Sequence, residues 1–487
     1  MENIKNPSKI FQKLNAEFLI LSSVVLIGIS HWIDVLWFLS FISLVPIFLL
    51  LESIKKQKEL VTVIFVFSFL YTLTFSFPLL SIESINALLD TTVINSIKFS
   101  ILIYILLRAL VIGISLTVVY LCTKNTLARL LYLPFVFVIH ELLLGFLSFS
   151  LFWGHIGEAL LPQESLRQFA FIGDVFLLTF IVVSFNILVL LIFKHRSHFY
   201  KLSSKKRILL ILAPALILMM LFITGSIIDG LKNGKISIGS INIAIVQPNF
   251  ISSPGQQYFD GLHKKTISVL SLYPDKDVDL LLLPGQYFGN VETSELNKKY
   301  VELSLLAPFQ SRSIVSSLTL DRDSKRYLVT ASFNEDGSIS ISEKESLFPF
   351  SDSIPKFIDA IFPKLENFSK RYERGESALL TINTEAGGVN IPALSCSEGF
   401  HPFIVRSLLK EERSSRIIIV SGNTGDFGSY LARKAHLRAS QLRAISNNSY
   451  VLHSMKTGPS AVISPSGKIL EKVSRDKEGV IFYNLIL

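Results

Sequence analysis

Long apolar runs fill the first half of the chain, and they limit its fold more than any other feature. Seven runs follow one another before residue 230: Phe18–Ser30, Val35–Leu51, Leu60–Leu80, Phe99–Leu121, Leu127–Phe146, Phe169–Phe193 and Ile208–Ile228. Most of them approach the ~20 residues that an α-helix needs to cross a bilayer. The later residues have an ordinary soluble composition. The sequence therefore predicts a membrane domain over residues 1–230, with about seven transmembrane helices, and a globular domain over residues 231–487.

The first two runs admit another interpretation, a single tilted helix over Phe18–Leu51. Such a helix would be longer than a bilayer requires and would carry Asp34 at its centre. The basic residues also favour two helices. They gather in the second, fourth and sixth loops, at Lys55, Lys56, Lys58, Lys124, Arg129, Lys194, Arg196, Lys201, Lys205, Lys206 and Arg207. The other loops hold only Lys98 and Arg167.

This alternation predicts the orientation of the chain, because cytoplasmic loops carry the excess of Lys and Arg. It puts the N-terminus in the cytoplasm and everything after Ile228 on the opposite face. The net charge of +9 fits this topology better than it fits binding to nucleic acid. A mean hydropathy of +0.50 with 17% charged residues excludes an ordinary soluble protein of this length.

From Ile241 onward, short β-rich runs alternate with helical stretches, which predicts an α/β domain. The expected strands are Ile241–Gln247, Asp279–Leu283, Ile314–Leu318, Tyr327–Phe333, Val389–Ser395, Ile417–Val420, Tyr450–His453 and Ser460–Ile463. The expected helices are His263–Leu272, Glu295–Leu305, Pro402–Leu409 and Leu431–Ser446. Several strands are continuously apolar, as expected for sheets covered by helices. The strand-like tail Ile481–Leu487 is too short to span a membrane.

Cys396 is the first candidate for chemistry. The apolar run Ile391–Ser395 ends at this cysteine, so a buried strand would deliver the thiol to its C-terminal edge. A thiol in that position is a candidate nucleophile, although most single cysteines are inert buried hydrophobes. Lys344 could supply the cation that favours the thiolate, the alternative being a solvated surface lysine. Glu398 follows the cysteine by two residues and could lie in the same cavity.

Seven motifs in this order resemble those of the apolipoprotein N-acyltransferase family, membrane enzymes that carry a nitrilase-type (carbon–nitrogen hydrolase) domain. They are Glu141, Trp153–Gly173, Ile243–Asn249, Lys344–Phe350, Cys396–Glu398, Asn423–Gly428 and His436–Ala444. The resemblance implies an α-β-β-α sandwich for the second domain. It also implies a Glu-Lys-Cys triad, in which Cys396 takes an acyl chain from a membrane phospholipid as a thioester. The acyl group then passes to the N-terminal amine of a diacylglyceryl-cysteine lipoprotein.

The resemblance further implies a location and a set of partners. The protein would be a multi-pass protein of the bacterial inner membrane whose second domain is periplasmic. Phospholipids would be its acyl donors and lipoproteins its acceptors. We expect no cofactor, because the sequence has no glycine-rich phosphate-binding loop, and no metal, because His401, His436 and His453 lack a repeated ligand spacing.

One departure from the family pattern concerns the general base. The family has Pro-Glu at the end of the second strand, whereas this chain has Pro284-Gly285-Gln286. Gly285, or Gln286 after a one-residue slip, stands in place of the glutamate, and a neutral amide cannot accept the thiol proton. Glu398 or Asp352, which stands where the family usually has Glu, is then the candidate for proton transfer.

The sequence leaves three functions open. The first is an active N-acyltransferase that uses Cys396, Lys344 and another carboxylate. The second is a catalytically degenerate homologue that binds lipid or lipoprotein without turnover. The third is an acyltransferase or amidase that acts on another amine. Cys396 and Lys344 favour chemistry, whereas the residues at 285 and 286 favour the degenerate homologue.

Overall fold

A computed structural model of the chain describes residues 15–81, 91–147, 152–194, 204–233, 240–250, 256–274, 276–285, 287–304, 311–348, 352–353, 372–385, 387–411, 416–425 and 428–486. Part of the basic loop predicted between 194 and 207 lies outside these residues, as does Gln286. The chain forms two compact units. The first comprises residues 1–77, 102–148 and 153–233, and the second comprises residues 78–101, 149–152 and 234–487. The predicted boundary at residue 230 stays a prediction.

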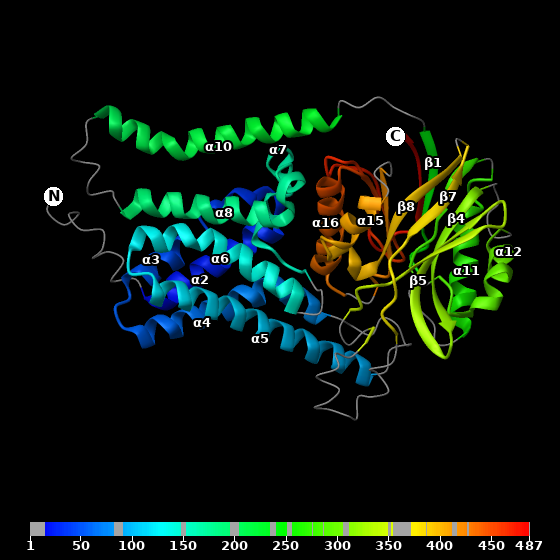
Figure 1. The fold of residues 1–487 in the computed structure, drawn as a ribbon, viewed down its shortest axis with the longest axis horizontal. Helices are drawn as coiled ribbons and strands as arrows, with labels where there is room; N and C mark the ends of the chain where they lie inside the picture. Colours follow the sequence, from blue (N-terminus) through cyan, green and yellow to red (C-terminus); the bar gives the residue numbers. More distant parts are fainter. Residues whose placement is uncertain are drawn as a thin grey trace. The chain divides into compact units, whose positions relative to one another are not determined.

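Helices make up the first unit (Figure 1). The helices of this half of the chain are α2 (Ala16–Trp32), η1 (Asp34–Phe41), α3 (Val45–Ser53), α4 (Gln57–Ser76), η2 (Phe77–Ser81), α5 (Thr91–Cys122), α6 (Thr126–Leu147), η3 (Ile156–Leu160), α7 (Glu164–Arg167), α8 (Ala170–Lys194) and α10 (Ser204–Asn233). The first part of α5 and most of η2 are grouped with the second unit. Among the described residues, 6 segments are long and apolar enough to span a bilayer. The first predicted run forms α2, an apolar helix of 17 residues that is shorter than those six. The helical membrane region is thus confirmed, with six candidate spans and a shorter apolar helix before them.

The second predicted span is broken rather than continuous. The 3₁₀ helix η1 ends at Phe41, and α3 begins at Val45 with Pro46 in its first turn. Asn186 of α8 fills the break, because its side chain accepts a hydrogen bond from Leu44 N and donates one to Ser40 O, each at 2.7 Å. A buried amide therefore satisfies backbone groups that the break leaves without helical partners.

The second unit contains two β-sheets with helices outside them (Figure 1). The larger sheet has the order β13-β1-β2-β4-β5-β6, with β3 paired to β4; the smaller has the order β12-β11-β10-β9-β8-β7. The strands of the larger sheet are β1 (Ser240–Gln247), β2 (Val278–Leu282), β3 (Asn290–Glu292), β4 (Ser311–Arg322), β5 (Lys325–Asn334), β6 (Ile339–Glu343) and β13 (Gly479–Ile486). Those of the smaller are β7 (Leu379–Thr384), β8 (Gly387–Ser395), β9 (Ile417–Gly422), β10 (Tyr450–Met455), β11 (Ser460–Ile463) and β12 (Ile469–Val473). The main helices are α11 (Gln256–Leu270), α12 (Leu296–Ser304), α15 (Ile404–Glu411) and α16 (Tyr430–Asn447).

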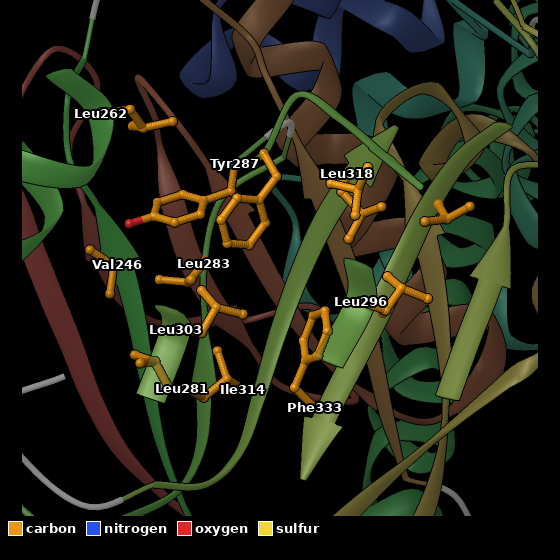
Figure 2. Packing of buried hydrophobic residues seen from close by; sticks show 14 of the residues in the cluster. Val246, Leu262, Leu281, Leu283, Tyr287, Leu296, Leu303, Ile314, Leu318 and Phe333 are labelled. Atoms are coloured by element: carbon orange, nitrogen blue, oxygen red, sulfur yellow. The ribbon is translucent and has the colours of Figure 1, made fainter. Parts of the chain in front are cut away.

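Alternate residues of the central strands enter different layers of the core. Ile243 and Ile245 of β1 pack in a cluster built from strands of both sheets. Their neighbours Ala244 and Val246 pack instead with residues of α11 and α12, and Figure 2 shows Val246 in this outer layer. A third cluster joins the smaller sheet to α15 and α16. Both faces of each sheet are therefore covered, which explains the continuously apolar strands and confirms the predicted α-β-β-α sandwich.

Candidate active site

Cys396 lies where β8 ends and the short 3₁₀ turn η6 (Cys396–Phe400) begins. β8 runs parallel to β9, with Ser395 paired to Ser421, so the ends of two central strands meet at the cysteine. The backbone of Cys396 has a φ of 49°, in the left-handed region. A non-glycine residue costs about 1–2 kcal/mol there, so the surrounding turn must hold the cysteine in place.

Glu398 holds this turn and is buried, with 1% of its surface exposed. Its Oε2 accepts a hydrogen bond from Ser395 N at 2.8 Å, across the turn. Its Oε1 accepts from Glu345 N at 2.8 Å and Ser346 N at 3.0 Å, which ties the turn to the segment that carries Lys344. Burial raises the pKa of Glu398, against the lowering effect of Lys344 and these three N–H groups. The carboxylate is thus a backbone anchor at the site.

Lys344 comes directly after the edge strand β6 and is also buried, with 3% exposed. Its Nζ donates a hydrogen bond to Asp352 Oδ2 at 2.8 Å. Burial by itself lowers the pKa of Lys344, but the negative charges of Asp352, Cys396 and Glu398 outweigh it and hold the pKa above its usual value. The solvated surface lysine is excluded, and the structure supplies a buried cation that acts electrostatically on the thiol.

Asp352 is the other carboxylate of the site, and Lys344 occupies one of its oxygens. The same Oδ2 also accepts a hydrogen bond from Phe348 N at 2.7 Å. Asp352 therefore balances the charge of the lysine and fixes the segment that follows it.

The end of β2 lies tightly against the end of β9. Gly285 N donates to Gly422 O at 3.2 Å, and a Cβ built on Gly285 would lie 2.5 Å from Gly422 Cα. A Cβ built on Gly422 would in turn lie only 3.1 Å from Cys396 Cα. Backbone therefore fills the space at position 285. Because Gln286 is outside the described residues, the vacant base position stays a prediction.

His436 is a site residue to which sequence reasoning gave no role. Its Nε2 lies 3.9 Å from Cys396 Sγ, although the two residues are 40 positions apart. The imidazole is buried on α16 and contacts the rings of Phe400 and His453, at centroid distances of 5.0 and 5.4 Å. Burial, assisted by the positive charge of Lys344, lowers the pKa of His436 to about 4. The spacing Ala432-His436-Ser440 on the predicted helix was the available signal, because it places His436 on one face with small residues.

Two charged residues of the predicted spans, Arg108 and Glu141, are buried in the helical unit. Arg108 donates hydrogen bonds to the carbonyl groups of Trp153 and Gly154. Glu141 pairs with His155 at 3.1 Å and accepts a hydrogen bond from Thr179 at 2.8 Å. Arg108 and Glu141 thus both have polar partners in the segment 153–155, which follows α6 in the chain. Trp153 is only 2% exposed, so it is packed inside this unit.

Two regions of the chain match known families. Residues 25–188 match the family model described as apolipoprotein N-acyltransferase N-terminal domain, and residues 312–487 match carbon-nitrogen hydrolase. Among curated proteins, the apolipoprotein N-acyltransferase of Aquifex aeolicus is 25% identical over 72% of this chain and 75% of its own length. That of Thermotoga maritima is 24% identical over 72% of this chain and 64% of its own length, which is just under two thirds.

Two solved structures, one of a CN-hydrolase superfamily protein and one of a member of the nitrilase superfamily, are also similar to part of the chain. XC1258 from Xanthomonas campestris covers 51% of this chain with 91% of its own, at 18% identity and a TM-score of 0.39. Nit3 from Saccharomyces cerevisiae covers 52% with 92% of its own, at 21% identity and a TM-score of 0.38.

Proposed function

The chain belongs to the apolipoprotein N-acyltransferase family, and we propose that it transfers an acyl chain from a phospholipid to the N-terminal amine of a diacylglyceryl-cysteine lipoprotein. The observation that carries the proposal is the meeting of Cys396, buried Lys344 and Glu398 in one α-β-β-α sandwich. A multi-pass helical region in the same chain fits substrates that reside in a membrane.

The first half-reaction forms a thioester. The thiolate of Cys396 attacks the ester carbonyl carbon of the phospholipid, and the carbonyl π electrons move onto oxygen. Lys344, cationic and already buried, stabilises that oxyanion at no cost of reorganisation. The carbon–oxygen bond then breaks, the lysophospholipid leaves with a proton, and the acyl group stays on sulfur.

The second half-reaction releases the cysteine. The free α-amine of the lipoprotein attacks the thioester carbonyl, a carbon–nitrogen bond forms and the carbon–sulfur bond breaks. The amine loses one proton, which balances the proton that left with the lysophospholipid, and Cys396 is released from the acyl group. Lys344 again faces the oxyanion, so one cation serves both steps.

The proposed topology brings the hydrolase domain, residues 231–487, to the periplasmic face of the bacterial inner membrane, with the N-terminus in the cytoplasm. The alternation of basic loops supports it, with Lys55 and Lys124 on the cytoplasmic side. A periplasmic reporter fused after residue 235 should be active, and one fused after Lys124 should not. The opposite pattern would refute this orientation.

Two alternatives remain as proposals of lower rank. A degenerate homologue that binds lipid without turnover is favoured by the backbone packing of Gly285 on Gly422, which leaves no room for a carboxylate there. Transfer to another amine is the second alternative. Adding small primary amines in place of the lipoprotein would reveal it as release of N-acylated amine.

Acyl-enzyme trapping tests the main proposal. The full-length protein in detergent is incubated with a phospholipid that carries a labelled acyl chain, and hydroxylamine-sensitive label on Cys396 is measured by mass spectrometry. Cys122→Ser should still be labelled and Cys396→Ala should not. Transfer of the label to a diacylglyceryl-cysteine peptide completes the test. Absence of label from the wild-type protein would leave lipid binding without turnover.

A further inference from the structure

We propose that His436 is the proton acceptor for Cys396, so that the thiol is activated by a Cys–His pair. This role rests on the proposed acyl transfer and supplies the base that the sequence leaves open at Gly285 and Gln286. The observation behind it is the 3.9 Å separation of Cys396 Sγ and His436 Nε2. That distance is within hydrogen-bond reach for sulfur, and such bonds often shorten when substrate binds.

The two carboxylates of the site already serve other purposes. Both oxygens of Glu398 accept backbone N–H groups, from Ser395 on one side and from Glu345 and Ser346 on the other. Asp352 accepts hydrogen bonds from Lys344 and from Phe348 N. Using either carboxylate as the base would break contacts that hold the turn or the lysine.

The surroundings of His436 suit a base that accepts and returns one proton. Among the residues that the structure describes, the ionisable groups that face it come from different elements: Cys396 from η6, Lys344 after β6, and His453 from β10. Burial and Lys344 keep the imidazole neutral at pH 7, and a neutral ring can leave Nε2 with a free lone pair. Once the thiol ionises, the thiolate stabilises the imidazolium beside it, and Lys344 favours the thiolate. Phe400 and His453 pack against the ring and restrict its movement.

The proton balance then closes in both half-reactions. His436 Nε2 takes the proton of the thiol as sulfur attacks the ester, and gives it to the departing lysophospholipid oxygen. In the second half-reaction the same nitrogen takes the proton that the amine loses. His436 then returns it to Cys396, so the thiol and the neutral imidazole are both restored.

Alkylation of the thiol tests this pair without any acyl substrate. The rate at which iodoacetamide modifies Cys396 is followed against pH in the full chain, in the wild type, His436→Gln and His436→Asn. Without the acceptor the thiolate is less stable, so the midpoint of the rate profile should move to higher pH in both variants. His401→Gln is the matched control, because this nearby imidazole contacts Phe403 instead of the thiol. Its midpoint should stay at the wild-type value.

Acyl-enzyme formation gives a second measurement. Loss of a general base typically slows a reaction by about 10²-fold or more, so kcat for thioester formation should fall by that factor while KM for the phospholipid stays unchanged. If one of the two His436 variants does not fold, the measurement is made on the variant that retains the wild-type gel-filtration profile. An unchanged alkylation midpoint in that variant would overturn the Cys–His pair, whatever the acyltransferase does. A shifted midpoint in a chain that no phospholipid acylates would sustain the pair and refute the proposed function.

Discussion

Lys344 Nζ and Asp352 Oδ2 lie 2.8 Å apart, and both residues are almost completely buried. The proposed chemistry requires that Lys344 stay cationic and that Cys396 be available to react, and the pair serves both requirements. Lys344 must stay cationic beside an incoming ester, although burial favours its neutral form. Asp352 offsets that effect with its charge and leaves Cys396 available to react.

Asp352→Asn removes the charge while keeping the size of the side chain. A buried cation left without its partner typically costs about 3–5 kcal/mol, so the free energy of unfolding of the detergent-solubilised chain should fall by about that amount in calorimetry. Asp352→Glu, which restores the charge, should recover most of the loss. Glu345→Gln is the control, because this residue forms an exposed pair with Arg374, and it should change stability by less than about 1 kcal/mol. Equal effects of the two substitutions would contradict the assigned role of Asp352.

Glu398→Gln tests whether the carboxylate anchors the turn. A glutamine has one acceptor oxygen, and its NH₂ group must face Ser395 N or the two N–H groups of Glu345 and Ser346. At least one buried N–H group is then unsatisfied, at a cost of about 1–3 kcal/mol. We expect a lower melting temperature and slower alkylation of Cys396, because the left-handed cysteine loses support. Wild-type values for both would exclude the anchor.

The fold was predictable wherever burial on two faces leaves a local signature. Strand β1 shows this, since Ile243 and Ala244 are both apolar although they enter different layers. Two edge strands, β6 and β7, were missed for the opposite reason. β6 and β7, with sequences ISISE and LLTINT, lie at the ends of their sheets and alternate with polar residues. Such short alternating segments resemble loops when nothing local marks the sheet.

The candidate site was predictable in its separate parts but not in their contacts. Cys396 was indicated by the apolar run before it, and Lys344 by its motif. The approach of His436 to the thiol is created by the packing of α16 on the smaller sheet, across 40 positions of sequence. The close contact of Gly285 with Gly422 likewise joins two different sheets. Neither contact leaves a periodic pattern in the sequence from which it could have been predicted.

The contact between Gly285 and Gly422 predicts unequal effects of two substitutions for the missing glutamate. Gly285→Glu should destabilise the chain, because the new Cβ would lie 2.5 Å from Gly422 Cα, and relieving this clash would require the backbone of Gly422 to move. Gln286→Glu changes a neighbouring side chain and should leave the melting temperature closer to wild type, with any gain in thioester formation marking the vacant base position. Gly388→Ala is the control, since its Cβ would be 3.7 Å from Thr381. Gly285→Ala as stable as Gly388→Ala would disprove the tight contact.

Acid should destabilise the hydrolase unit through its buried histidines. Burial lowers the pKa of His436 to about 4, assisted by Lys344, and that of His401 to about 4, assisted by Arg443. The pKa of a histidine in an unfolded chain is about 6.5. Below that pH the unfolded state therefore binds protons that the folded state does not bind. Stability supplied by the neutral rings is therefore present above pH ~6.5 and is lost as the pH falls through about 4.

Each such histidine contributes at most about 1.4 kcal/mol per pH unit in this interval. Melting temperatures measured between those two pH values should fall with acidity, and the slope should be smaller in His436→Gln and in His401→Gln. Acidic groups elsewhere titrate in the same interval, but they contribute equally to wild type and variant, so the difference in slope isolates the histidine. An identical slope in His436→Gln would mean that the imidazole is solvated, and the buried pair with Cys396 would then be wrong as well.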